Sequence, residues 1–476
     1  MENFWDFSVW SLILLFAVLL LSLLVANVLK RSIKILQKSL IPTSVLAGLI
    51  LLVLSTLYEA IFGVSLFNTA IFGGKGTSTL EMITYHTLAL GFIAATLKTS
   101  DKKMTKKRAT EVFNSGVTTV STYLLQAVLG LGITIVASFI IKDFFAAAGV
   151  LLPFGFGQGT GQALNFGGIY EEQGFVGGRS FGLTIAALGF LSASVGGVIH
   201  LHGMKKKGKL KFKPLDGGSV TTEEIESKNE IPMNGSIDKI TVQIALIAVS
   251  YALSYLAMYG LSLLLPGMKA TVYGFNFLFG ALFAVAVKSV LNLLNNKRVV
   301  KRQYTNNFLL TRISNSCFDI MIVAGIAAIR LDVLKNYWVI IAILALVGLV
   351  STYVYNLFIA KSLFPEYKDE QFMAMYGMLT GTASTGIMLL REIDGDFISP
   401  ASDNLIYQQF PAIAFGFPLM LLANLAPSEP YLTFAILVAF FIVMNIILFR
   451  SKIFKKKKPL AEVPLGETAV TDKTDE

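Results

Sequence analysis

Long apolar segments separated by short polar connections occupy most of this chain. Eleven runs with few or no charges are long enough to cross, or nearly cross, a hydrocarbon layer of about 30 Å. Five precede the middle of the sequence, at residues 7–29, 40–57, 82–97, 112–141 and 180–201. Six follow it, at residues 240–265, 270–294, 313–329, 336–360, 404–426 and 431–449. The pattern predicts an all-α integral membrane protein of about eleven transmembrane helices. Runs 82–97 and 313–329 are short for a full crossing, so the pattern places their ends only to within several residues.

Two glycine-rich stretches do not fit ordinary membrane helices. Residues 149–168 carry no charge and contain Pro153 and the run GFGQGTG, and residues 377–386 read GMLTGTASTG. Irregular backbone at membrane depth is tolerated only where protein or a water-filled cavity surrounds it, and such segments in corresponding places of two halves are typical of a transporter's binding site. Close helix packing through small residues is the alternative, but it explains less well why Thr, Ser and Gln accompany both sets of glycines.

The distribution of charge predicts the orientation in the membrane. Thirty of the 40 Lys and Arg residues fall in alternate connections, at residues 30–38, 98–108, 205–239 and 297–312 and from residue 450 onward. Because basic connections stay in the cytoplasm, the N-terminus is expected outside and the C-terminus inside a bacterial inner membrane or plasma membrane. The first run is followed by Lys30 and Arg31 and shows no small-residue cleavage site, so we interpret it as a first helix rather than a signal peptide.

The same topology predicts that the two halves are inverted repeats. The first half begins outside and ends in the cytoplasm after five helices. The second half therefore begins in the cytoplasm, and its first five helices run in the reverse orientation. The expected organisation is a first repeat (1–202, hairpin 149–168), a cytoplasmic linker (203–238), a second repeat (239–426, hairpin 371–390), an additional helix (427–450) and a charged cytoplasmic tail (451–476). Re-entrant hairpins entering from opposite sides are expected to meet near the midplane.

Composition supports the membrane assignment and argues against several other classes. The chain is 54% hydrophobic and 15% charged, with a mean hydropathy of +0.66, which is more apolar surface than a soluble core can bury. The net charge of +10 follows the membrane topology, so no nucleic-acid partner is expected. One cysteine and three scattered histidines make no recognisable catalytic set, and neither glycine run fits a nucleotide-binding loop. We expect neither enzymatic activity nor a cofactor.

One stretch resembles a known family. Residues 154–175, FGFGQGTGQALNFGGIYEEQGF, resemble the first re-entrant motif of the glutamate:sodium symporter (ESS) family, and Ile41–Pro42 at the start of the second run is similar to that family's pattern. In the second motif, Ser384 stands at the family's proline position and Leu379 at a glycine position, whereas four other positions can be aligned: Gly377, Gly381, Thr385 and Ile387. The resemblance covers about residues 7–426. It implies secondary active transport of glutamate coupled to sodium by a homodimer.

The candidate binding residues are the neutral polar residues and glycines of the two hairpins. Broken helix ends present free amides to anions and free carbonyls to cations, and neutral oxygens suit a hard ion such as sodium or an amino-acid substrate. The first hairpin offers Gln158, Gly159, Thr160, Gly161, Gln162 and Asn165. The second offers Thr380, Gly381, Thr382, Ser384 and Thr385. The sequence does not say which of them would bind the ion and which the substrate.

Charged residues add three candidates. Arg391, just beyond the second hairpin, is placed to clamp a carboxylate in a bidentate fork, although Glu392 and Asp394 nearby also fit a plain cytoplasmic ion pair. Asp319 is the acidic residue well inside an apolar run, and it would bind sodium, carry a proton or make a structural polar contact between helices. Arg179 is a weaker clamp candidate, and a helix-end anchor is the competing interpretation.

These observations predict a sodium-coupled symporter of glutamate or a related acidic amino acid. The alternatives are a proton-coupled or passive transporter of another organic anion, or a membrane sensor that uses the linker or tail to contact a soluble partner.

Overall fold

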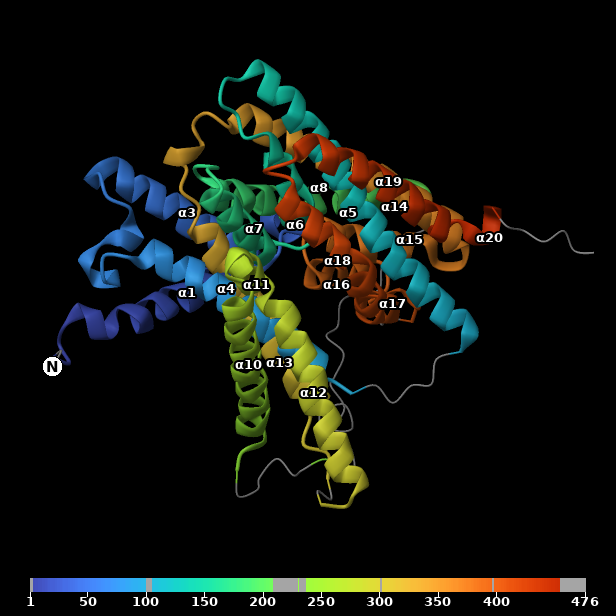
Figure 1. Cartoon of the computed structure of the whole chain (residues 1–476), viewed down its shortest axis with the longest axis horizontal. Helices are drawn as coiled ribbons and strands as arrows, with labels where there is room; N and C mark the ends of the chain where they lie inside the picture. Colours follow the sequence, from blue (N-terminus) through green and yellow to red (C-terminus); the bar gives the residue numbers. More distant parts are fainter. Residues whose placement is uncertain are drawn as a thin grey trace, which may run out of the picture.

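The computed structural model describes residues 3–99, 105–208, 230, 237–299, 302–395 and 398–453, and it is a bundle of helices (Figure 1). Within these residues ten helices are long and apolar enough to cross a membrane, and a bent pair supplies an eleventh crossing if it counts as one span. The all-α fold expected from the sequence is therefore confirmed, and its long apolar helices fit a multi-pass membrane protein. One isolated parallel bridge, between Glu230 and Gln303, is the β-structure of the described part.

The long helices follow the apolar runs in order. Those of the first half are α1 (Phe7–Ser32), α3 (Thr43–Phe62), α4 (Gly76–Leu97), α5 (Lys106–Ile140) and α8 (Gly178–Lys206). Those of the second half are α10 (Lys239–Leu264), α12 (Asn276–Asn296), α13 (Asn307–Ala327) and α14 (Trp338–Leu363), then the pair α17 (Ala401–Tyr407) and α18 (Gln409–Leu425), and finally α19 (Pro430–Leu448). Short helices α2 (Lys34–Lys38), α11 (Lys269–Gly274) and α20 (Arg450–Ile453) lie in the connections.

Polar residues fix several helix starts. The side chains of Thr105, Asp238 and Asn306 accept hydrogen bonds from the first backbone amides of α5, α10 and α13, which have no partner inside the helix. Pro430 stands at the first position of α19, where its missing N–H costs no hydrogen bond.

The structure moves some predicted boundaries. Helix α4 begins at Gly76 rather than at residue 82, and α13 begins at Asn307 rather than at residue 313. Helix α8 continues to Lys206, so the predicted linker start at residue 203 is too early. The predicted run 404–426 is bent by 48° between α17 and α18. Most of the linker, and tail residues 454–476, lie outside the described residues.

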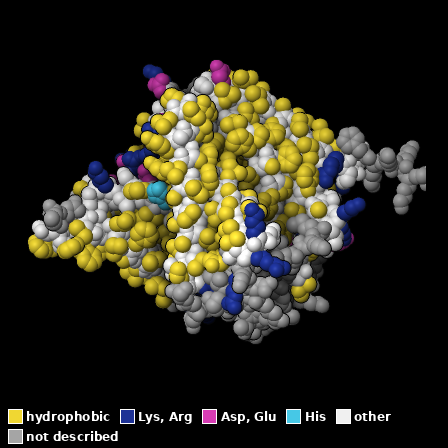
Figure 2. Space-filling view, turned by 60° about the horizontal axis from the view of Figure 1, so that its bottom comes forward, with side chains coloured by type: hydrophobic (Ala, Val, Ile, Leu, Met, Phe, Trp, Pro, Cys, Tyr) yellow, Lys and Arg dark blue, Asp and Glu magenta, His cyan; other side chains and the backbone are white. Residues whose placement is uncertain are grey.

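Two groups of helices pack around the middle of the bundle. Helices α4 and α13 lie along each other, flanked by α1, α3, α10 and α12, while α5 and α14 pack together with α8 and α18, and α19 covers α5 (Figure 1). Much of the outer surface is apolar: Figure 2 shows a face covered mainly by hydrophobic side chains with few charged ones between them. Such a surface is what a helical bundle presents to lipid.

The connections gather at two ends of the bundle. At one end the Thr99 backbone amide donates to Asn307 Oδ1 at 2.8 Å, and Arg450 Nη1 donates to Asn114 Oδ1 at 3.0 Å. The first contact joins the end of α4 to the start of α13, and the second joins the end of α19 to the first part of α5. At the other end Arg179 Nη1 lies 3.5 Å from Glu81 Oε2 and 3.3 Å from Glu171 Oε2.

Candidate functional site

The chain leaves helical geometry at both glycine-rich segments. In the first, a 3₁₀ turn (Ala146–Val150) and α6 (Leu151–Phe156) lead to a break before α7 (Thr160–Glu172). In the second, α15 (Lys368–Leu379) is separated by three residues from α16 (Ala383–Arg391). All four helices are shorter than the roughly 20 residues that a membrane crossing needs, so none of them spans a bilayer alone.

The two breaks touch each other although more than 200 residues separate them in sequence. Gly159 has φ +79° and ψ −169°, a conformation in which side chains are strained. A Cβ atom added at Gly159 would lie 3.1 Å from Thr382 Cγ2 and 3.5 Å from the Gly381 carbonyl oxygen. Glycine is therefore required here both by its backbone conformation and by the close approach of the second break.

Helix ends of both polarities converge at this contact. The first amides of α7 and α16 point out of their helices at the breaks, and so do the last carbonyls of α6 and α15. Helix N-termini carry a partial positive charge and C-termini a partial negative charge. The arrangement thus provides binding groups for both an anion and a cation within one small region. These groups belong to the backbone rather than to charged side chains.

Helix α5 holds both breaks in place. Tyr123 Oη donates to the Gly157 carbonyl at 3.0 Å, and Gln126 Nε2 donates to the Leu379 carbonyl at 3.0 Å and to Thr352 Oγ1 at 2.8 Å. Tyr123 and Gln126 were not among the residues predicted from the sequence. The available signal was the row of Ser, Thr and Gln residues at helical spacing within the apolar run 112–141.

The first-hairpin candidates are almost all buried. Thr160 Oγ1 donates to the Met321 carbonyl at 3.3 Å, and Asn165 Nδ2 donates to the Gly274 carbonyl at 3.1 Å, so both tie α7 to neighbouring helices. Gly161 packs so closely that an added Cβ would lie 2.7 Å from Leu88 Cδ1. Gln158 is partly exposed beside the break.

Gln162 differs from the other candidates of α7. Its side chain is only 2% exposed, yet neither its oxygen nor its nitrogen has a hydrogen-bond partner among the described residues. Buried polar side chains in folded proteins are nearly always paired. An unpaired amide in the first turn of α7, beside the break, is therefore a candidate ligand-binding group.

The second-hairpin candidates divide by exposure. Thr380 is buried, and its hydroxyl donates to the Tyr376 carbonyl at 2.7 Å. The hydroxyls of Thr382 and Thr385 lie 3.4 Å apart at the start of α16, and Ser384 is exposed. Gly381 packs against Phe190, whose Cδ1 would lie 2.9 Å from an added Cβ.

The structure does not bring Arg391 to the break. Arg391 is the last residue of α16, which places it about 13 Å along the helix axis from Thr382. It is exposed, and the neighbouring carboxylate of Glu392 is close enough to Lys30 and Arg391 to feel both charges. The ion-pair interpretation fits this position better than the carboxylate clamp does.

Asp319 also lies apart from the break. A Cβ added at Gly161 would lie 2.9 Å from the sulfur of Met321, so Met321 faces α7. Asp319 precedes Met321 by two positions, which is about 200° around the helix, and it points away from that contact. Its side chain is exposed, and the Ser44 hydroxyl of α3 lies beside it.

Arg179 occupies the position of a helix-end anchor. It lies at the start of α8, where its guanidinium pairs with Glu81 of α4 and Glu171 of α7. The Arg330 guanidinium reaches the same Glu171 at 3.8 Å. This cluster joins several helices at the end of the bundle opposite the basic segments, as the competing interpretation of Arg179 expects.

An apolar groove lies away from the two breaks. A groove of about 520 Å³ lies between α4 and α10, lined by Tyr85, His86, Leu90, Ala248, Tyr251, Ala252, Tyr255, Met258 and Tyr273. Its lining is almost entirely apolar, and His86 Nδ1 bonds Tyr251 Oη at 2.6 Å. The groove offers no positive group for a dicarboxylate. In the described part of the chain, no group of three or more His, Cys, Asp or Glu residues is placed to hold a metal ion.

Sequence comparison identifies no relative of this chain. No model of a known protein family matches the chain, and no curated protein matches it.

Proposed function

We propose that this protein is a secondary active transporter that couples uptake of glutamate, or a related acidic amino acid, to sodium. The observation that carries the proposal is the contact between the two helix breaks at Gly159, Gly381 and Thr382. Broken helices that meet inside a membrane bundle supply binding groups for a substrate and an ion together. A protein that merely packed its helices through small residues would not need to interrupt both helices at the same place.

The pairing of helices supports inverted repeats. The third long helices of the two halves, α4 and α13, pack together, and so do the fourth, α5 and α14. The last helix of each half lies against the fourth helix of the other: α8 packs on α14, and α18 on α5. We propose that each half contributes one re-entrant hairpin, formed by α6 with α7 and by α15 with α16, and that the hairpins enter from opposite sides.

The chemistry of the breaks favours an amino acid bearing carboxylates. The N-terminal ends of α7 and α16 attract carboxylate groups without a buried Arg or Lys, which is consistent with the remote position of Arg391. Carbonyl ends and hydroxyls, including those of Thr382 and Thr385, suit a hard cation such as sodium. The orientation with the basic end in the cytoplasm, and a homodimeric assembly, belong to the same proposal.

Uptake into liposomes tests the function directly. The purified protein is reconstituted, and labelled glutamate is followed with an inward sodium gradient, with potassium in place of sodium, and with an added proton gradient. We expect accumulation above equilibrium with the sodium gradient alone. Protein-free liposomes and vesicles whose gradient has been collapsed with an ionophore are the controls.

Each other outcome contradicts part of the proposal. Accumulation driven by protons would replace sodium as the coupling ion. Equilibration without accumulation would indicate a passive transporter, and a lack of glutamate flux in every gradient would overturn the substrate assignment. A sensor would show no flux of any amino acid or organic anion.

A further inference from the structure

Helix α5 carries a buried polar stripe that the two breaks do not account for. Its members are three or four residues apart, except for the adjacent pair Thr118 and Thr119, and so lie on one face of the helix. Each is no more than 1% exposed: Ser115, Thr118, Thr119, Thr122 and Gln126. We call this set the α5 stripe. The four hydroxyls of the stripe donate to α5 carbonyls one turn earlier, and their oxygens can still accept from donors on the facing helices.

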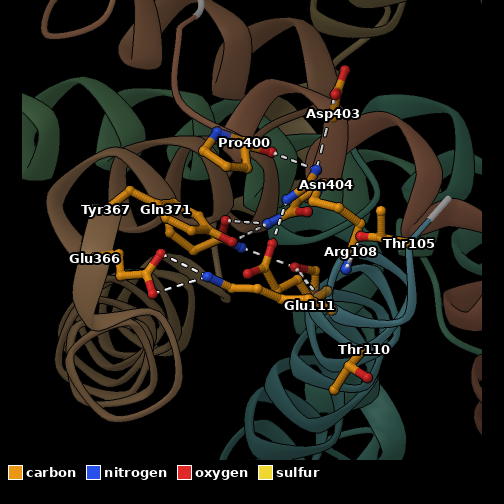
Figure 3. A network of polar contacts seen from close by, with 12 residues as sticks. Thr105, Arg108, Thr110, Glu111, Glu366, Tyr367, Gln371, Pro400, Asp403 and Asn404 are labelled. Atoms are coloured by element: carbon orange, nitrogen blue, oxygen red, sulfur yellow. Dashed lines mark hydrogen bonds and ion pairs between the residues drawn. The ribbon is translucent and has the colours of Figure 1, made fainter. Parts of the chain in front are cut away.

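The end of the stripe nearest the start of α5 is paired with α15 and α17. Gln371 Nε2 donates to Ser115 Oγ at 3.0 Å, and Asn404 Nδ2 donates to Gln371 Oε1 at 3.0 Å. Figure 3 shows this end, where the chain of contacts reaches Arg108 and Glu111 near the start of α5. The stripe therefore begins among charged side chains at the basic end of the bundle.

The residues further along α5 form a cluster with α14. Gln126 Nε2 donates to Thr352 Oγ1 at 2.8 Å, and Asn356 Nδ2 donates to the Thr352 carbonyl at 3.0 Å and to Thr122 Oγ1 at 3.4 Å. All four side chains are at most 2% exposed. Because Gln126 also bonds the Leu379 carbonyl at 3.0 Å, the cluster adjoins the end of α15 at the second break.

Two acceptor oxygens of this cluster are left over. Gln126 Oε1 and Asn356 Oδ1 have no hydrogen-bond partner in the parts of the chain that the structure describes. A buried acceptor without a partner destabilises the folded state, because it has lost its hydrogen bonds to water. The amide nitrogens of both residues are already engaged, so the remaining demand of the cluster is for a positive or donating group.

We propose that the cluster of Thr122, Gln126, Thr352 and Asn356 binds a sodium ion. Its side-chain ligands are neutral oxygens, which suit a hard cation of single charge, whereas Ca²⁺ sites ordinarily include carboxylates. The C-terminal end of α15 adds the negative end of a helix dipole. A small gap lies beside Asn356, lined also by Thr118, Gln371 and apolar side chains.

This inference rests on the proposed function, because it names the site of the coupling ion. Gln126 links the cluster to Leu379, the last residue of α15 before the break. Sodium held by Gln126 and Asn356 would fix the amide that caps α15, and so would hold the second break in one arrangement. Ion binding and substrate binding are then coupled through a contact of one side chain.

Thermal unfolding of the purified full-length protein tests the site without any transport. The midpoint is measured in detergent in sodium, potassium and choline chloride at equal ionic strength. We expect a saturable rise of the midpoint with sodium that exceeds the rise with potassium, since an ion that binds only the folded state stabilises it. Gln126→Leu and Asn356→Leu should lose this sodium-dependent shift.

Matched variants separate loss of the site from general damage. Thr134→Val removes another buried hydroxyl of α5, which donates to the Ala146 carbonyl at 2.6 Å away from the cluster; it should lower the midpoint but keep the sodium shift. If the leucine variants do not fold, Thr122→Val should weaken the apparent sodium affinity at least tenfold, and Thr122→Ser should preserve it.

The outcomes distinguish this proposal from that of the function. No sodium-selective shift in the unaltered protein would overturn the site, even if sodium drives glutamate uptake. A sodium-dependent rise of the midpoint that persists in folded Gln126→Leu and Asn356→Leu proteins would show that the ion binds outside this cluster. A shift that depends on the cluster, in a protein that does not take up glutamate, would support the site and overturn only the substrate.

Discussion

At the scale of single residues, Gln162 separates a contribution to stability from a contribution to binding. Its buried amide has no partner among the described residues, so replacing it with an apolar side chain of similar size removes no protein hydrogen bond. We predict that Gln162→Leu changes the free energy of unfolding by less than about 1 kcal/mol or increases it. The KM for substrate should rise at least tenfold in the liposome assay, because the substrate then loses its contact with the Gln162 amide.

Asn165, one turn further along α7, provides the control. Its amide donates to the Gly274 carbonyl, so Asn165→Leu leaves a protein acceptor unpaired and should cost about 1–3 kcal/mol of stability. If Gln162→Leu destabilises the protein as much as Asn165→Leu and leaves KM unchanged, Gln162 is a structural residue.

At the scale of elements, the break between α6 and α7 depends on Gly159. Alanine there would be strained at φ +79°, and its Cβ would lie 3.1 Å from Thr382 Cγ2. We predict that Gly159→Ala lowers the free energy of unfolding by about 1–3 kcal/mol and abolishes accumulation of substrate. Thermal unfolding and uptake of the same preparation measure both effects.

Gly260 is a matched control within a regular helix. It lies in α10, and an added Cβ would meet nothing within 4 Å. Gly260→Ala should therefore be neutral or stabilising, by up to about 1 kcal/mol. Full uptake by Gly159→Ala would show that the strained contact between the breaks is not needed for transport.

At the scale of the whole molecule, the alternation of basic and weakly basic connections along the sequence predicts which connections face the cytoplasm. The chain has a single cysteine, Cys317, so Cys317→Ala provides a background for single-cysteine labelling. Lys75 and Lys106 are both exposed and lie in connections predicted to face opposite sides. An impermeant maleimide should label Lys75→Cys in intact cells and Lys106→Cys only after permeabilisation.

The labelling experiment carries its own controls. The Cys317→Ala background must remain unlabelled in both conditions, and each variant must retain uptake. Labelling of Lys106→Cys but not Lys75→Cys in intact cells would invert the proposed orientation. Labelling of both in intact cells would contradict the assignment of these connections to opposite sides.

Some features of the fold and the candidate site could be predicted from the sequence because they are local. The order of the long helices follows the apolar runs, and both helix breaks fall in the glycine-rich segments. The errors were at boundaries such as the start of α4, where Gly76 and the polar residues after it are helical although they are not strongly apolar. The 48° bend between α17 and α18 has no clear local signal of its own.

Hydropathy and glycine content act on each segment separately, so the sequence alone predicts an all-helical chain of long apolar segments and the places where its helices are interrupted. Which side chains meet follows only from the folded arrangement of the helices. It turned Asp319 away from α7, left Arg391 at the far end of α16, and aligned Gln126 with the end of α15 and with Thr352. These outcomes depend on the rotation and packing of whole helices, which no single segment encodes.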